Sequence, residues 1–223
     1  MEIQIRNIRK KYGKNEVLKG VSFFARPGEC VGILGGNGSG KSTLFSVLAG
    51  VNKSDGGSFF CGEKDLLQNP GLLSRMVSYI PQKDPLMPEL TARDHLSLWY
   101  EKEDLERELE QGLLSLLGIG DFLKIPVSKM SGGMKKRLSI GCAAGKRSPI
   151  LILDEPDSGL DLPCKECIRL YLEKHMAAGG IVLLATHDLR QIEFCQRLYL
   201  LKKGETAPYD FRGDVPTLLE DLR

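Results

Sequence analysis

The sequence predicts an α/β fold in which a mostly parallel sheet is flanked by helices. A buried strand, a glycine-rich loop and a helix follow one another between residues 30 and 49. After residue 131, short apolar strands alternate with helices, which is typical of a parallel sheet covered on both faces. Between about 85 and 130 the strand-like runs disappear. This stretch is therefore predicted to be a helical subdomain inserted into the α/β core.

Composition sets the class of protein. The chain has 223 residues, enough for one domain with or without an inserted lobe, and we expect a single domain over 1–223. Hydrophobic residues make up 42% and charged residues 27%, which excludes disordered, collagen-like and disulfide-stapled classes. The net charge of +2 is too mild to indicate a nucleic-acid partner, and none is expected.

No segment of the sequence is expected to enter a membrane. The longest apolar runs, at 150–153 and 181–185, are far shorter than the roughly 20 residues of a spanning helix. Residues 1–6 are polar and alternating, with no signal-peptide core. We therefore expect a cytoplasmic protein whose membrane role, if any, depends on a partner.

Residues 1–60 show strands and turns. Ile3 and Ile5 alternate with Gln4 and Arg6, which is the period of a strand. Residues 26–29 have turn chemistry, and a buried strand over 30–34 and a helix over 42–49 follow.

The middle stretch carries helix signals. Residues 91–94 have the form of a helix start with a capping box. Residues 101–110 hold six acids and two bases, typical of a solvated helix face. An apolar stripe of four leucines follows, at 113, 114, 116 and 117, and Gly118 is the expected helix end.

Strands and helices alternate again in the last part of the chain. The expected helices lie near 133–145, 163–178 and 188–195, and the expected strands at 150–153, 181–185 and 197–201.

The cysteines are expected to be free thiols. Cys164 and Cys167 are the only close pair among six, and no second cysteine or histidine pair stands at zinc-finger spacing. Metal binding by this pair is not expected.

Residues 35–42, GGNGSGKS, fit the phosphate-loop pattern G-x-x-x-x-G-K-[ST] between a buried strand and a helix. The glycines let backbone N–H groups turn inward around an anion, and the helix N-terminus adds a favourable dipole. Lys41 is expected to reach the β- and γ-phosphates, and the Ser42 hydroxyl to bind Mg²⁺. A glycine-rich turn with a chance lysine is the alternative, and eight matched positions in this context disfavour it. The expected nucleotide-binding residues here are Gly35, Asn37, Gly38, Ser39, Gly40, Lys41, Ser42 and Thr43.

Two acids end the buried strand at 150–153. Ligands bind at the tips of strands in open α/β sheets. Asp154 is placed to hold Mg²⁺, and Glu155 to polarise a water against the γ-phosphate. A surface pair of acids is the alternative.

Together these motifs resemble the ATP-binding subunits of ATP-binding cassette (ABC) transporters, over nearly the whole chain. The run 130–137, MSGGMKKR, resembles the family's signature motif, and 158–161, SGLD, its D-loop. His187 resembles the switch histidine, Gln82 the Q-loop glutamine and Tyr12 the aromatic residue that stacks on adenine. Each motif alone has an ordinary structural explanation, but their order and spacing favour the family.

The resemblance implies a P-loop NTPase fold. Its parts would be a RecA-like and β core, over 1–84 and 131–223, with an N-terminal antiparallel β subdomain, and a helical subdomain over 85–130. It also implies catalytic roles for Lys41, Gln82, Glu155 and His187. Mg²⁺ would be held by Ser42, Gln82 and Asp154. Further contacts to ATP would come from Tyr12, Ser131, Gly132, Gly133 and Asp161.

The resemblance further implies partners. Two cassettes, identical or not, would pair head to tail around ATP and Mg²⁺, each ATP lying between one phosphate loop and the other signature. Separate transmembrane permease subunits would bind the cassette at the cytoplasmic face of the membrane. Leu86, Met87 and Leu90, near Pro85 and Pro88, are candidate docking residues, with local core packing as the alternative.

Two residues depart from the family pattern. Met134 stands where the signature commonly ends in glutamine, which puts the hydrolysis rate in question. Asp157 stands where a small hydroxyl residue is usual, adding a negative charge near the acid pair.

The favoured function is therefore a transport-coupled ATPase subunit, bacterial and exporter-type, with cargo and direction left open. Alternatives are a soluble cassette ATPase serving another assembly, such as iron–sulfur cluster biogenesis, and a weakly hydrolysing regulatory module. A small phosphate-loop kinase fits poorly, because such kinases lack the signature, D-loop and switch histidine together.

Overall fold

The N-terminal part of the chain forms an antiparallel sheet. The computed structural model describes residues 2–157 and 159–222. Strand β1 (Ile3–Tyr12) pairs on one side with β2 (Asn15–Ala25) and on the other with β4 (Gly56–Cys61), which in turn pairs with β5 (Lys64–Asp65). The expected alternation in β1 buries isoleucine side chains on one face, and a register shift keeps Ile8 on that face as well.

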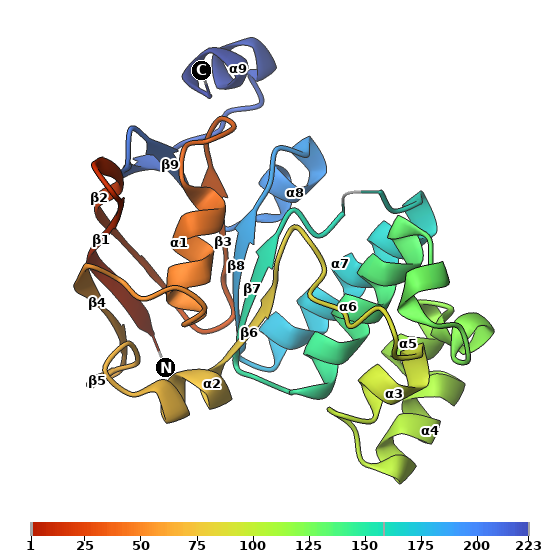
Figure 1. The fold of residues 1–223 in the computed structure, drawn as a ribbon. Coiled ribbons are helices and arrows are strands. Elements are labelled where there is room, and N and C mark those ends of the chain that lie inside the picture. Colours follow the sequence, from red (N-terminus) through yellow and green to blue (C-terminus); the bar gives the residue numbers. More distant parts are fainter. Residues whose placement is uncertain (1, 158, 223) are drawn as a thin grey trace.

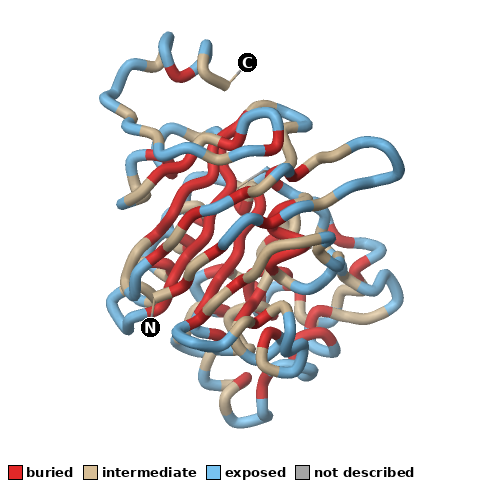
Figure 2. The backbone as a smooth tube through the Cα atoms, turned by 90° about the vertical axis from the view of Figure 1, so that its left-hand side faces the viewer, coloured by how far each residue is buried: buried red, intermediate tan, exposed pale blue. Residues whose placement is uncertain are grey.

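A second sheet of six strands forms the centre of the molecule, in the order β10-β9-β3-β8-β7-β6. Its strands are parallel except β10, which runs antiparallel to β9. Every residue of β3, β7 and β8 is buried, because helices cover both faces (Figures 1 and 2). The strands are β3 (Cys30–Leu34), β6 (Val77–Ile80), β7 (Ile150–Asp154), β8 (Ile181–Ala185), β9 (Arg197–Lys202) and β10 (Glu205–Tyr209). The predicted α/β fold with a mostly parallel sheet and an antiparallel N-terminal sheet is confirmed.

Several of the helices that follow begin at polar side-chain caps. Ser131, Asp161, Asp188 and Asp214 each accept a backbone hydrogen bond at a helix start. The helices are α1 (Lys41–Leu48), α2 (Pro70–Met76), α6 (Gly132–Gly145), α7 (Leu162–Ala177), α8 (Leu189–Phe194) and α9 (Val215–Asp221). Helix α1 lies between the two sheets, and its apolar side chains share one core with β1, β2 and β4.

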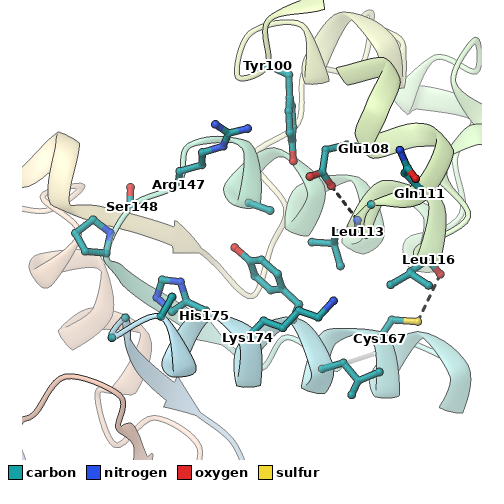
Figure 3. A pocket seen from close by; sticks show the side chains of 18 residues that line it. Tyr100, Glu108, Gln111, Leu113, Leu116, Arg147, Ser148, Cys167, Lys174 and His175 are labelled. Atoms are coloured by element: carbon teal, nitrogen blue, oxygen red, sulfur yellow. Dashed lines mark hydrogen bonds between the residues drawn. The ribbon is translucent and has the colours of Figure 1, made fainter. Parts of the chain in front are cut away.

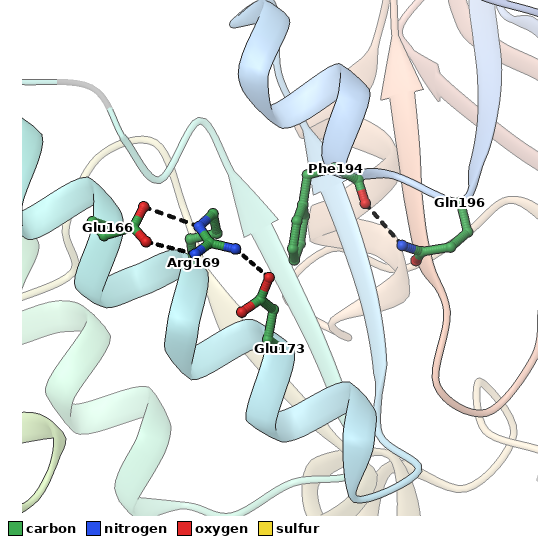
Figure 4. Close-up of polar contacts among 5 residues, drawn as sticks. All are labelled: Glu166, Arg169, Glu173, Phe194 and Gln196. Atoms are coloured by element: carbon green, nitrogen blue, oxygen red, sulfur yellow. Dashed lines mark hydrogen bonds and ion pairs between the residues drawn. The ribbon is translucent and has the colours of Figure 1, made fainter.

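The exposed face of α7 (Leu162–Ala177) carries ion pairs. Arg169 pairs with Glu166 one turn before it and with Glu173 one turn after it (Figure 4). Because these pairs are exposed to solvent, they add little to helix stability. The opposite face buries Ile168 and Leu172 against the sheet.

Between β6 and α6 the chain is helical, and Figure 1 shows these helices beside the sheet. Thr91 and Asp94 form the predicted capping box at the start of α3. The predicted leucine stripe is only partly buried, since Leu114 is fully buried whereas Leu116 is 56% exposed. Gly118 ends this turn with a left-handed φ of 61°, as expected of a helix end. The elements are α3 (Ala92–Leu96), α4 (Lys102–Gln111), α5 (Leu113–Leu116) and two short 3-10 helices, Ile119–Phe122 and Val127–Lys129.

Two C-terminal elements, β10 and α9, have no counterpart among the predictions. A tight turn at Lys203 and Gly204, both with positive φ, folds β10 back onto β9. Helix α9 buries Leu218 against Leu34 at the end of β3. Its last turn lies on the loop after β3, where a Cβ at Gly36 would stand 2.4 Å from the carbonyl oxygen of Leu222.

A large cavity, of about 620 Å³, lies at the amino-terminal ends of β7 and β8 (Figure 3). In it the backbone N–H of Leu113 donates to the Glu108 carboxylate at 2.8 Å, and the Cys167 thiol donates to the Leu116 carbonyl. None of the motif residues lines this cavity. Size alone therefore does not identify the functional site.

All six cysteines are free in the structure. Although Cys164 and Cys167 are the close pair in sequence, the fold also brings Cys30 and Cys195 together, with 3.5 Å between their sulfur atoms. In residues 2–157 and 159–222, no group of three or more His, Cys, Asp and Glu side chains could hold a metal ion. None of the described helices is both long enough and apolar enough to cross a membrane.

Candidate functional site

The phosphate loop joins β3 to α1 at the carboxyl end of the parallel sheet. Gly38 and Gly40 have φ of 78° and 108°, which side chains other than glycine rarely adopt. At Gly35 a Cβ would lie 2.5 Å from both the Ser39 hydroxyl and the Leu201 carbonyl oxygen. The glycine spacing therefore meets a steric need of this loop.

Lys41 is the buried cation of the loop. Its Nζ donates to the carbonyl oxygens of Gly35 at 2.6 Å and Gly36 at 3.2 Å. Burial lowers the pKa of Lys41, while the nearby carboxylates of Glu155 and Asp154 oppose that shift. The ammonium is thus already held between the loop and the acids.

Asp154 ends β7 with its side chain buried at 2% exposure. Burial raises the pKa of its carboxyl, a shift that a hydrogen bond with Ser42 opposes. One carboxylate oxygen, Oδ2, is buried without a hydrogen-bond partner. A buried, unpartnered carboxylate oxygen beside a serine hydroxyl fits Mg²⁺, which prefers oxygen ligands and takes few of them from protein.

The side chains of Gln82, Glu155 and His187, which come from distant parts of the chain, meet next to the end of β7. The side-chain amide of Gln82 donates to Glu155 Oε2 at 2.9 Å. On the other side, Nδ1 of His187 lies 3.4 Å from Glu155 Oε1. Strand pairing explains this meeting, because β6, β7 and β8 are adjacent and parallel, and all three residues lie at or just beyond the carboxyl ends.

Glu155 is also held by its backbone. Its φ is 50°, in the left-handed region, and its N–H donates to the Ala185 carbonyl at 3.0 Å. A non-glycine residue in this region costs about 1–3 kcal/mol and persists only where its surroundings hold it. The side chain is 15% exposed, and that of His187 is 72% exposed. A ligand in solution can therefore reach Glu155 and His187.

The signature and D-loop residues lie apart from the phosphate loop. Ser131 caps α6 by accepting from the N–H of Met134, and Asp161 caps α7 by accepting from the N–H of Cys164. A Cβ at Gly133 would lie 3.3 Å from the Gly159 carbonyl, whereas Gly132 faces open space. Ser158, the first residue of the predicted D-loop, is outside the described residues. In the described parts of the chain, no hydrogen bond joins Ser131, Gly132, Gly133 or Asp161 to residues 35–43.

Tyr12 stands at the end of β1 with 48% of its surface exposed. Lys10 lies over its ring at 5.3 Å, and the Asn52 amide donates to its hydroxyl at 3.4 Å. Asn52 also donates to the Ser46 hydroxyl on α1 at 2.9 Å. The ring is therefore tied to the helix that follows the phosphate loop.

Comparisons with known proteins identify the family. A family model described as ABC transporter matches residues 18–158. The chain belongs to the ABC transporter family. It is 32% identical to the linearmycin resistance ATP-binding protein LnrL of Bacillus subtilis (strain 168), over 96% of this chain and 70% of that protein. It is 34% identical to the Nod factor export ATP-binding protein I of Paraburkholderia xenovorans (strain LB400), over 91% of this chain and 68% of that protein.

One solved structure gives the same fold. It is a dimeric post-hydrolysis state of the ATP-binding cassette MJ0796 bound to ADP and phosphate, with a TM-score of 0.82 and 28% identity. The match covers 95% of this chain and 99% of that one. The chain is therefore an ATP-binding cassette with the P-loop NTPase fold.

In this cassette a buried lysine supports the Gln82 segment, and it was missed from sequence. Lys136 on α6 is 3% exposed, and its Nζ donates to the carbonyl oxygens of Pro81 at 3.0 Å and Gln82 at 3.2 Å. The same Nζ lies 3.2 Å from the Asp84 carboxylate. Lys136 stands in the signature run, but its partners are more than 50 positions away, so no local pattern could have identified this role.

The candidate docking residues line only part of a groove. A cavity of about 190 Å³ is lined by Leu86 and Met87 and also by Leu98 and Trp99, which sequence reasoning missed. Met87, Leu98 and Trp99 are 53%, 60% and 46% exposed. Leu90 is half-buried and does not line this groove.

The two departures from the family pattern have different surroundings. Met134 is half-buried and packs against the core that joins α6 to the helical stretch. Asp157 is half-buried, and its Oδ1 has no hydrogen-bond partner. Burial raises the pKa of Asp157, and the positive charge of Lys165 opposes that shift.

Proposed function

We propose that the cassette hydrolyses ATP with Mg²⁺ and so powers a transporter whose membrane-spanning subunits are separate chains. The observation that carries the proposal is the contact of Glu155 with both Gln82 and His187 beside the phosphate loop. Phosphoryl transfer needs positioned donors, a metal and an oriented nucleophile, and this group supplies positions for all three.

Each residue would have one task. The backbone N–H groups of residues 35–42, with Lys41, would bind the phosphates, and Tyr12 would stack on the adenine. Ser42, Asp154 and Gln82 would hold Mg²⁺, which neutralises phosphate charge when bound. Glu155 would accept a hydrogen bond from the attacking water, and His187 would orient the γ-phosphate.

A second cassette would complete the site. Ser131, Gly132, Gly133 and Asp161 lie apart from the phosphate loop of their own chain, which suits residues that contact ATP on a partner. The N-terminus of α6 favours an anion, because unpaired N–H groups and the helix dipole point toward it. The dimeric state of the similar cassette supports head-to-tail pairing, between identical or different subunits.

The groove lined by Leu86, Met87, Leu98 and Trp99 would receive the membrane subunit and hold the cassette at the cytoplasmic face. Exposed apolar residues gathered in one groove commonly mark an interaction site. The Nod factor export relative supports a bacterial exporter-type assignment. The residues 85–130 would be the subdomain that carries the docking groove.

Phosphate release by the purified cassette tests hydrolysis. We expect turnover that requires Mg²⁺ and is lost in Lys41→Ala. Transfer of phosphate to a small molecule instead of water would favour a kinase, and no turnover even at high protein concentration would favour a regulatory nucleotide-binding module.

Fractionation of native cells tests the membrane partner. We expect the cassette in the membrane fraction and its release by Trp99→Glu. Leu219→Glu is the matched control, because Leu219 is similarly exposed at 55% but lies on α9. A wild-type cassette found only in the non-membrane fraction would favour the alternative of a cassette serving another assembly.

A further inference from the structure

Helices α7 and α8 begin side by side, and one ion pair joins their first turns. Nζ of Lys165 on α7 lies 3.4 Å from Oδ2 of Asp188. The other carboxylate oxygen of Asp188 accepts from the N–H of Arg190 at 2.9 Å and so caps α8. The Asp188 N–H donates to the Thr186 hydroxyl at 3.0 Å. Asp188 thus binds both Thr186, which precedes His187, and the first turn of α8, which follows it.

Asp157, on the segment that follows Glu155, lines the same small cavity as this ion pair. Asp157, Lys165 and Asp188 line one cavity of about 190 Å³, together with Glu155 and His187. Asp157 Oδ1 is buried and makes no hydrogen bond. The positive charge of Lys165 lowers the pKa of Asp157 and so favours its carboxylate form, whereas the negative charge of Asp188 raises that pKa. One ammonium and two carboxylates from different segments therefore line one cavity.

We propose that Lys165 is a positioning residue whose ammonium neutralises Asp157 and Asp188 together and so holds the His187 segment against Glu155. The kinetic part of this proposal rests on the proposed hydrolysis, whereas the ion cluster itself does not. Asp157 is the departure from the family pattern that makes a shared counter-ion necessary, because a small hydroxyl residue there would bring no charge.

Asp157 and Asp188 carry like charges when both are ionised. Without Lys165, two carboxylates would line the same small cavity, and either the segments would separate or one acid would take a proton. Separation would move His187 away from Glu155, since Asp188 follows it directly. The other charged or titratable groups around the two cavities that Asp157 lines are Glu155, Glu166, His187, Arg169 and Arg190. Of these, Arg169 pairs with Glu166, and neither Arg169 nor Arg190 lines the cavity that contains His187.

The test compares four proteins: Lys165→Met, Asp157→Ser, the double variant and Lys174→Met. Lys174 is the matched control, on the same helix but in no ion pair within the described residues. We expect Lys165→Met to lower kcat about tenfold or more with KM changed less than twofold, a loss typical of misplaced catalytic groups. Adding Asp157→Ser should restore kcat to within about threefold of wild type, because the repulsion is gone. Lys174→Met should behave as wild type.

Two further readouts separate positioning from simple destabilisation. The deficit of Lys165→Met should shrink as pH falls and Asp157, whose pKa burial raises, takes a proton, and this recovery should vanish in the double variant. Thermal unfolding needs no turnover: Lys165→Met should lower Tm by about 3 °C, and Asp157→Ser should restore it.

The outcomes distinguish this proposal from the proposed function. A double variant as slow and as unstable as Lys165→Met overturns the shared counter-ion, and so does a Lys165→Met protein that matches wild type. A wild-type protein without turnover overturns the proposed hydrolysis, but the Tm comparison still decides whether Asp157 and Lys165 are coupled.

Discussion

The side-chain amide of Gln82 donates a 2.9 Å hydrogen bond to the carboxylate of Glu155, across 73 positions of sequence. This bond joins the segment that precedes the helical stretch to the tip of a central strand of the parallel sheet. A movement of the helical stretch would therefore be felt at Glu155 through Gln82. Lys136 adds to this link, because it binds the carbonyl oxygens of Pro81 and Gln82 from α6.

Replacing Glu155 by glutamine should abolish turnover without removing ATP binding. The amide oxygen can still accept from Gln82, so the fold is kept, but the amide is a poor acceptor for the proton of water. We expect phosphate release to fall at least about a hundredfold. With ATP present, the variant should elute as a dimer in size-exclusion chromatography. Glu63→Gln, at an exposed position, is the control. Turnover near the wild-type rate would remove Glu155 from its proposed role.

Replacing Gln82 by alanine should affect the rate more than the affinity. Glu155 loses its hydrogen-bond donor and becomes less well oriented, and Mg²⁺ loses the proposed Gln82 ligand while Ser42 and Asp154 remain. We expect kcat to fall about tenfold, a change of about 1.4 kcal/mol in the activation free energy, with ATP affinity within about twofold. Gln68→Ala provides an exposed glutamine for comparison. Equal losses in both variants would show that the effect is not specific to the Glu155 contact.

Replacing Asp154 by asparagine should stabilise the metal-free protein at neutral pH. Burial raises the folded-state pKa of Asp154 above its ordinary value of 3.8. The folded protein then binds this proton more tightly than the unfolded chain, so the free energy of unfolding falls as pH rises from about 3.8 through the folded-state pKa. A gain of about 1 kcal/mol in the free energy of unfolding at pH 7.5 would raise the Tm of the variant by about 2–4 °C. At pH 4 the gain should be near zero.

Added Mg²⁺ provides the second half of this experiment. Mg²⁺ with ATP should raise the Tm of wild type more than that of Asp154→Asn, because the variant lacks the carboxylate ligand. A variant that is less stable than wild type without metal would contradict the inferred burial penalty.

Replacing Gly145 by alanine should loosen the packing of α6 against the helical stretch. A Cβ there would lie 2.4 Å from the ring of Tyr100, whose hydroxyl donates to the Gly141 carbonyl at 3.0 Å. Overpacking of this kind costs about 1–3 kcal/mol. Thermal unfolding should show a clearly lower Tm, whereas Gly120→Ala, with no atom within 4 Å of the added Cβ, should change little.

The features that the sequence predicted are mostly local. The strand, loop and helix around Lys41 are contiguous, and the glycines, lysine and serine of the loop each have a requirement that can be stated without knowing the fold. The capping box at Thr91 and Asp94 is equally local, and the structure contains it. The alternation of strands and helices after residue 131 likewise sufficed to predict the parallel sheet.

The features that were missed depend on which segments become neighbours. Lys136 is an ordinary basic residue until the fold places it under Pro81 and Gln82. Leu98 and Trp99 are part of a helical stretch, and only the packing of α3 leaves them exposed on one groove. The thiols of Cys30 and Cys195 are 165 positions apart, so no spacing rule could pair them.

The contact between α9 and the phosphate loop couples the position of α9 to the nucleotide-binding backbone. The Leu222 carbonyl rests on Gly36 where no side chain could fit, while Lys202 and Tyr209 hold Asp221 from β9 and β10. A displacement of α9 would therefore change the space beside the backbone at Gly36, in the loop that is proposed to bind the phosphates.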